Sequence, residues 1–77
     1  MLELHAIFSG AVQGVGFRFT TKNYANQLGL KGTVKNLPDG KVELVVQGSK
    51  PLLEKLIQVL DQDAFPHKIV EKRLEFR

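Results

Sequence analysis

The residues best suited to chemistry form one glycine-rich stretch, residues 10–18, which reads Gly-Ala-Val-Gln-Gly-Val-Gly-Phe-Arg. Three glycines within seven residues allow the backbone to curl and to approach a ligand without an intervening Cβ atom. Successive N–H groups in such a curl, at the start of a helix, point into one small space and favour an anion there. Arg18 adds a permanent cation with planar donors. We therefore predict a phosphate-binding loop at residues 13–18, made of Gln13, Gly14, Val15, Gly16, Phe17 and Arg18.

The stretch does not fit the two common nucleotide-binding patterns. A P-loop ends in Gly-Lys-Ser/Thr, whereas Gly16 is followed by Phe17 and Arg18. A dinucleotide loop that started at Gly14 would require glycine at position 19, which is Phe19. A nucleoside phosphate is therefore not the expected ligand. On glycine content alone, a flexible strand-to-helix connection with an exposed arginine explains the stretch equally well.

Two blocks of the sequence resemble the acylphosphatase family. The first is residues 10–18, and the second is residues 32–43, Gly-Thr-Val-Lys-Asn-Leu-Pro-Asp-Gly-Lys-Val-Glu. They occur in the family's order and spacing, and the resemblance covers nearly the whole chain. It implies a small hydrolase of carboxyl-phosphate mixed anhydrides with a ferredoxin-like fold and without metal or other cofactor. It also implies that Arg18 holds the phosphate and Asn36 positions the attacking water.

The chemistry of an acyl phosphate makes this residue set sufficient. Its leaving group is a carboxylate, which is stable as an anion and needs no general acid. What remains is to hold the phosphoryl group, spread its transition-state charge and direct a water in line. Arg18 can contact the phosphate with two donors, and the neutral amide of Asn36 can orient water without repelling the substrate. Since neither block carries a histidine, we expect the water's proton to pass to the phosphoryl group itself.

The glycines of the loop are expected to serve backbone geometry rather than chemistry. Substitution of Gly14 or Gly16 by alanine is expected to damage the loop sterically. Without the family resemblance, Arg18 would be read as a solvated surface residue and Asn36 as a turn former.

Composition limits the possible classes of protein. Seventy-seven residues predict one domain, residues 1–77, and the absence of cysteine excludes a disulfide framework and a thiolate nucleophile. A hydrophobic fraction of 43% with 25% charged residues is typical of a globular domain. No apolar run reaches the length of a membrane span and no signal peptide is present, so we expect a cytoplasmic protein without a membrane partner. The formal charge of +3 suits an anionic ligand, such as an acyl phosphate or a phosphate or sulfate ion.

Hydrophobic periodicity predicts the elements that must position these residues. Residues 2–9 alternate between apolar and polar positions and predict a strand. From Phe17 the apolar or small positions follow one stripe of a helix, and Gly29 stands where its C-terminal cap is expected. Residues 30–37 and 42–47 predict a hairpin, joined by a Pro-Asp-Gly turn.

The second half of the chain predicts one further helix and strand. Ser49 is a suitable N-cap for a helix that buries four apolar residues, Leu53, Leu56, Ile57 and Leu60. Residues 61–66 are predicted to be a connector, and residues 68–76 an edge strand in which Lys72 is tolerated. The order βαββαβ predicts an α+β, ferredoxin-like, two-layer sandwich, with an antiparallel sheet and both helices on one face.

The other candidate residues carry weaker signals. His5 and His67 have no paired spacing for zinc, so no metal site is expected. Serine and aspartate residues elsewhere are better explained as strand, cap or solvated residues; they are Ser9, Ser49, Asp61 and Asp63. The helical spacing of Phe17 and Tyr24 predicts that both lie in the core.

The chain departs from the family pattern at three places. Ala11 stands where the family commonly has a cation, and Thr33 replaces the usual aromatic residue. Family members also continue beyond the position of Arg77 with a loop and a short final strand, so we expect an exposed sheet edge. Arg18 and Asn36 are both present, and the chemistry is expected to survive these changes.

Two further function classes remain open. A ferredoxin-like nucleic-acid-binding module would carry exposed aromatic residues on its central strands, and residues 43–46 contain none, which disfavours nucleic acid as a partner. A non-catalytic acyl- or carbamoyl-phosphate-binding domain is the other alternative. A monomer is expected, whereas the physiological substrate is not specified by the sequence.

Overall fold

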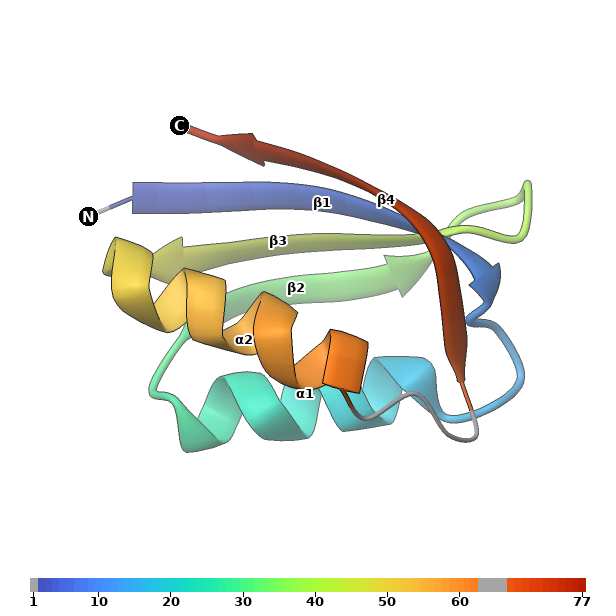
Figure 1. Ribbon diagram of the computed structural model, residues 1–77, viewed down its shortest axis with the longest axis horizontal. Helices are drawn as coiled ribbons and strands as arrows, with labels where there is room; N and C mark the ends of the chain where they lie inside the picture. Colours follow the sequence, from blue (N-terminus) through green and yellow to red (C-terminus); the bar gives the residue numbers. More distant parts are fainter. Residues whose placement is uncertain (1, 63–66) are drawn as a thin grey trace.

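The computed structural model describes residues 2–62 and 67–77, which form a four-stranded sheet with two helices on one face (Figure 1). The elements are β1 (Leu2–Ala11), α1 (Phe17–Gln27), β2 (Lys31–Asn36), β3 (Val42–Gly48), α2 (Lys50–Gln62) and β4 (Lys68–Phe76). The strand order is β2-β3-β1-β4, and every neighbouring pair is antiparallel. The predicted βαββαβ, ferredoxin-like sandwich is confirmed. Within the described residues no helix is both long and apolar enough to cross a bilayer.

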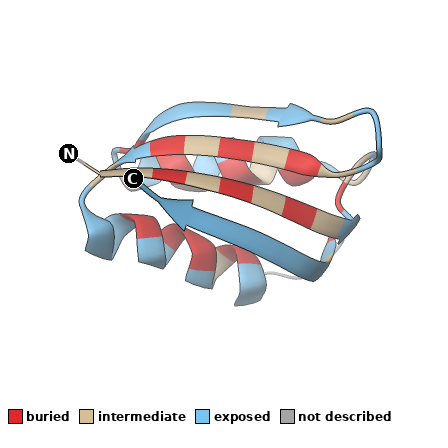
Figure 2. Ribbon diagram, turned by 90° about the horizontal axis from the view of Figure 1, so that it is seen from above, coloured by how far each residue is buried: buried red, intermediate tan, exposed pale blue. Residues whose placement is uncertain are grey.

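The core lies between the two central strands and the helices. Alternate residues of β1 and β3 are buried, whereas the outer strands β2 and β4 are mostly exposed (Figure 2). The buried strand residues are Leu4, Ala6, Phe8, Val42, Leu44 and Val46. They pack against the apolar stripes of α1 and α2, because side chains alternate along a strand and recur every three or four residues along a helix.

Strand β1 is two residues longer than predicted. Gly10 and Ala11 pair with β4 opposite Ile69 and Lys68, after a register shift that follows Ser9. Gly10 has φ +123°, and a Cβ atom there would lie 2.4 Å from the carbonyl oxygen of Lys68. Gly10 therefore belongs to the strand and not to the curled loop. The pairing that holds it comes from the far end of the chain.

Helix α1 ends as predicted at Gly29. This glycine has φ +71°, in the left-handed region that glycine adopts without strain. The Gly29 N–H donates to the Asn26 carbonyl at 3.1 Å, and the Leu30 N–H donates to the Ala25 carbonyl at 2.9 Å. These two bonds form a Schellman cap, which satisfies the last carbonyls of the helix and sends the chain into β2.

Helix α2 continues through Gln62, so the connector predicted at residues 61–66 begins later than expected. Residues 63–66, which include the predicted connector residue Asp63, lie outside the described part of the chain. Asp61 on the last turn of α2 accepts a hydrogen bond at 2.7 Å from Lys72 of β4. This contact explains the lysine that interrupts the apolar pattern of β4, and the edge position predicted for that strand is confirmed.

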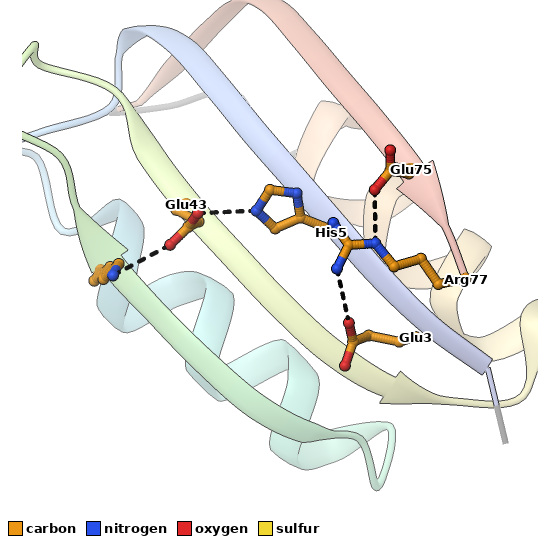
Figure 3. A network of polar contacts seen from close by, with 6 residues as sticks. Glu3, His5, Glu43, Glu75 and Arg77 are labelled. Carbon is orange, nitrogen blue, oxygen red and sulfur yellow. Dashed lines mark hydrogen bonds and ion pairs between the residues drawn. The ribbon is translucent and has the colours of Figure 1, made fainter.

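The face of the sheet opposite the helices carries a polar network (Figure 3). His5 Nε2 lies 2.8 Å from a Glu43 carboxylate oxygen, and Lys35 Nζ lies 3.4 Å from the other oxygen. The hydrogen bond from His5, with a smaller contribution from Lys35, holds the pKa of the Glu43 carboxyl below its ordinary value. Arg77 adds ion pairs with Glu3 and Glu75 at 3.5 and 2.6 Å. The open face is therefore stabilised by charged pairs between strands rather than by a second layer.

Candidate active site

The loop between β1 and α1 leaves the start of the helix open. Gly14 and Gly16 have φ +74° and +78°, and Gly16 is the N-cap residue. No side chain caps the helix, and its first turn contains no acidic residue. The first backbone bond of the helix runs from the Thr20 N–H to the Gly16 carbonyl at 2.9 Å.

The backbone N–H groups of this loop are available to a ligand. Within the part of the chain that the structure describes, no N–H group from residues 13–19 donates to a protein acceptor. The first N–H groups of a helix have no intrahelical partner and carry the positive end of its dipole. The start of α1 therefore has the electrostatics of an anion site.

Arg18 and Asn36 lie at the same hollow, although they come from different elements. Arg18 is in the first turn of α1, and Asn36 is the last residue of β2. In Figure 1 the loop after β1, the start of α1 and the end of β2 lie together at the right. The hollow has a volume of about 190 Å³ and is lined by Val12, Gly14, Gly16, Phe17, Arg18, Phe19 and Asn36. The crossover from β1 to β2 places both strand ends on one side of the sheet, which brings these residues together.

The side chain of Gln13 connects this loop to the hairpin. Its Nε2 donates to the carbonyl oxygens of Leu37 and Lys41, both at 2.8 Å. Leu37 directly follows Asn36, so these bonds fix the loop against the strand end that carries Asn36. The sequence interpretation used only the backbone of Gln13 and missed this role. No local pattern signals it, because both partners are carbonyl groups of a distant turn.

The remaining predicted loop residues point into the protein interior. Val15 packs against the core, and Phe17 is buried as predicted. The Phe17 ring contacts Phe8 edge to face, with centroids 5.3 Å apart, and His67 at 4.7 Å. His67 is buried and donates from Nε2 to the Leu60 carbonyl at 3.1 Å. These contacts anchor the first turn of α1 from below.

The damage expected from alanine at Gly14 or Gly16 arises from backbone conformation and not from a clash with other parts of the protein. No heavy atom outside the neighbouring residues lies within 4 Å of a Cβ atom built on either glycine. The constraint at both positions is the positive φ, which strains any residue with a Cβ atom. Among the described residues, no group of three histidine, aspartate or glutamate side chains could hold a metal ion.

Comparison with known proteins gives one consistent result. The family model for acylphosphatase matches residues 4–75. The acylphosphatase of Trichormus variabilis is 47% identical over 58 residues, which are 75% of this chain and 57% of that protein. The acylphosphatase of Archaeoglobus fulgidus is 47% identical over 60 residues, which are 78% of this chain and 67% of that protein. The matched region thus spans about three fifths of the length of these relatives.

Solved structures share the complete fold. The crystal structure of acylphosphatase from Bacillus subtilis superposes with a TM-score of 0.94 and 31% identity, covering 100% of this chain and 86% of that chain. The crystal structure of T. kodakarensis HypF gives a TM-score of 0.87 and 35% identity, covering 100% of this chain but 10% of that chain. Since the family model matches nearly the whole sequence, this chain belongs to the acylphosphatase family.

Proposed function

We propose that the protein hydrolyses acyl phosphates to a carboxylate and inorganic phosphate. The observation that carries the proposal is that Arg18 and Asn36 line one hollow at the open N-terminus of α1. Membership of the acylphosphatase family supports the same activity.

Arg18 and the loop backbone bind the phosphoryl group. The free N–H groups of the loop and the first turn of α1 provide several donors, and the guanidinium provides a fixed positive charge. None of the described residues that line the hollow is acidic, so nothing there repels a dianion. These donors also stabilise the charge that spreads over the phosphoryl oxygens in the transition state.

Asn36 orients the attacking water. Its amide oxygen accepts a hydrogen bond from the water, and a lone pair of the water oxygen is then directed at phosphorus. The water oxygen forms a bond to phosphorus while the bond from phosphorus to the carboxyl oxygen breaks, and the carboxylate leaves with the electron pair. The water's proton passes to a phosphoryl oxygen. Because the leaving carboxylate needs no protonation, Arg18 and Asn36 are sufficient as side chains.

The similarity to HypF, whose chain is about ten times as long as the matched part, keeps a second candidate open. In that case the same hollow would bind an acyl or carbamoyl phosphate without hydrolysing it. A cytoplasmic, monomeric protein remains part of the main proposal and rests on composition alone.

The test is hydrolysis of benzoyl phosphate in the presence of a chelator, with titration of inorganic phosphate as a separate binding assay. Arg18→Lys keeps the charge but loses the planar donors, and we expect it to lower kcat/KM by at least about 100-fold and to weaken phosphate binding. Asn36→Ala should lose turnover but still bind phosphate. If the folded wild-type protein binds phosphate but does not hydrolyse benzoyl phosphate, the result would refute the hydrolase and favour the non-catalytic binding domain.

A further inference from the structure

A second hollow lies beside the phosphate site. It is a groove of about 430 Å³ between α1 and β2, more than twice the volume of the hollow at Arg18. Leu44 and Val46 of β3 line it at the bottom, and both are almost completely buried. The floor of the groove is therefore apolar, whereas exposed polar residues line its sides; they are Lys22, Asn26, Lys31 and Thr33.

The groove and the phosphate hollow share one face of α1. Four groove residues, Thr21, Lys22, Ala25 and Asn26, follow Arg18 at i+3, i+4, i+7 and i+8. These spacings place them on the stripe of the helix that begins with Arg18. A ligand held at Arg18 therefore lies next to the start of the groove on the same side of α1.

The same alignment holds on β2. Residues 31–34 line the groove, and Asn36, two residues after Val34 on the same strand, lines the phosphate hollow. Thr21 lies about 4.5 Å along the helix axis from Arg18. Val34 lies about 7 Å along the strand from Asn36. The two hollows are therefore about one helical turn apart on α1 and two residues apart on β2.

The groove also contains an unsatisfied polar atom close to this entrance. Thr21 is fully buried, and its Oγ1 has no hydrogen-bond partner within the described residues. A buried hydroxyl without a partner is costly, and an arriving acceptor removes that cost. Thr21 lies about one helical turn from Arg18, so this hydroxyl is close to the end of the groove nearest the phosphate hollow.

Two cationic side chains lie along the groove. Lys22 and Lys31 line it, and neither forms an ion pair with any residue that the structure describes. Their charges favour approach of an anionic substrate along the groove. Ala25, which follows Lys22 by about one turn of α1, contributes a small side chain to the wall of the groove.

We propose that this groove is the acyl-binding subsite and that it selects acyl phosphates with an unbranched apolar chain. The inference rests on the proposed function. The phosphoryl group lies at Arg18 and Asn36, and the chain runs along α1 over Ala25. The helix lines the groove from Thr21 to Asn26, about 7.5 Å of its axis, which suits a chain of about six carbon atoms.

The experiment compares kcat/KM for acetyl, butyryl, hexanoyl and octanoyl phosphate. Carboxylic acids of this series are nearly equal as leaving groups, so differences report on binding of the chain. Burial of each methylene should raise kcat/KM by up to about fourfold, levelling off near hexanoyl phosphate when the groove is full. Hydrolysis of all four at equal efficiency would overturn this inference and leave the proposed function intact. No hydrolysis of any by the folded protein would overturn both.

Two variants test the place of the chain. Ala25→Leu and Val34→Phe fill the groove from opposite walls, and each should reduce the hexanoyl-to-acetyl ratio of kcat/KM toward one. Val45→Phe is the matched control. Val45 lies in β3 between the groove residues Leu44 and Val46, so its side chain is on the other face of the sheet, and the substitution should leave the ratio unchanged. Urea unfolding identifies any variant that does not fold. The proposal would be refuted if a folded groove variant kept the wild-type hexanoyl-to-acetyl ratio of kcat/KM. It would also be refuted if this ratio fell toward one only in Phe19→Ala, because Phe19 lines the phosphate hollow and not the groove.

Discussion

Replacement of Gln13 by leucine should weaken both the fold and the site, although the Gln13 side chain does not line the phosphate hollow. The substitution keeps the approximate size of the side chain and removes the Nε2 donor. The lost bonds are the two 2.8 Å contacts to the carbonyl oxygens of Leu37 and Lys41. Because Leu37 follows Asn36, loss of these bonds frees the strand end that carries Asn36 from the phosphate loop.

The expected loss of unfolding free energy depends on whether the two carbonyl groups keep other hydrogen-bond donors. The Leu37 oxygen also accepts from the Gly40 N–H at 3.1 Å, and the Lys41 oxygen also accepts from the Leu37 N–H at 2.8 Å. Neither carbonyl is left without a partner, so the larger penalty for an unsatisfied buried group does not apply. Two net hydrogen bonds of about 1 kcal/mol each give a loss of about 2 kcal/mol. In a domain of this size that loss lowers Tm by about 8–16 °C.

Thermal and urea unfolding of Gln13→Leu, followed by circular dichroism, measure this loss. Gln47→Leu is the control, because Gln47 Nε2 donates only to the exposed Glu3 carboxylate at 3.2 Å and its loss should cost less than about 0.5 kcal/mol. Benzoyl phosphate hydrolysis should show a lower kcat for Gln13→Leu than for Gln47→Leu. A Tm for Gln13→Leu equal to that of the control would refute the assignment of Gln13 as the tether between loop and hairpin.

Three further predictions concern the loop, the open face and the core. Gly16→Ala should cost about 1–2 kcal/mol in urea unfolding through its positive φ alone, and Gly10→Ala clearly more, because its Cβ atom also meets the backbone of β4. The hydrogen bond from His5 holds the pKa of the Glu43 carboxyl below its ordinary value of 4.5, so this carboxylate stabilises the fold above pH 4.5 and its contribution is lost as pH falls through the lowered pKa. Glu43→Gln should therefore flatten the acid limb of the stability curve. Leu56→Ala, at a fully buried position of α2, should lower the free energy of unfolding by about 2–5 kcal/mol.

Local patterns were sufficient for the elements and for most of the core. The alternation of Leu4, Ala6 and Phe8 predicted which face of β1 is buried, since that face depends only on the period of the strand. Gly29 predicted the end of α1, because a left-handed residue after a helix is a local requirement. These features are encoded within a few neighbouring residues.

Features that depend on contacts between residues far apart in the sequence could not be predicted from local patterns. The extension of β1 through Gly10 and Ala11 depends on hydrogen bonds to β4, which no pattern near residue 10 reveals. The Gln13 side chain bonds to carbonyl groups that only the hairpin turn brings within reach. The open space around Gly14 and Gly16 could not be predicted either, because the space around a loop is set by the elements beyond it.

Residue types and short spacings were enough to predict that a glycine-rich loop opens a helix, because backbone freedom and charge are properties of single residues. The resemblance of two sequence blocks to one family then singled out Arg18 and Asn36 as the candidates for chemistry. Only the tertiary structure placed Arg18 and Asn36 at one hollow and aligned that hollow with the groove between α1 and β2. The physical reason is the crossover from β1 to β2, which brings the start of a helix and the end of a later strand to one edge of the sheet.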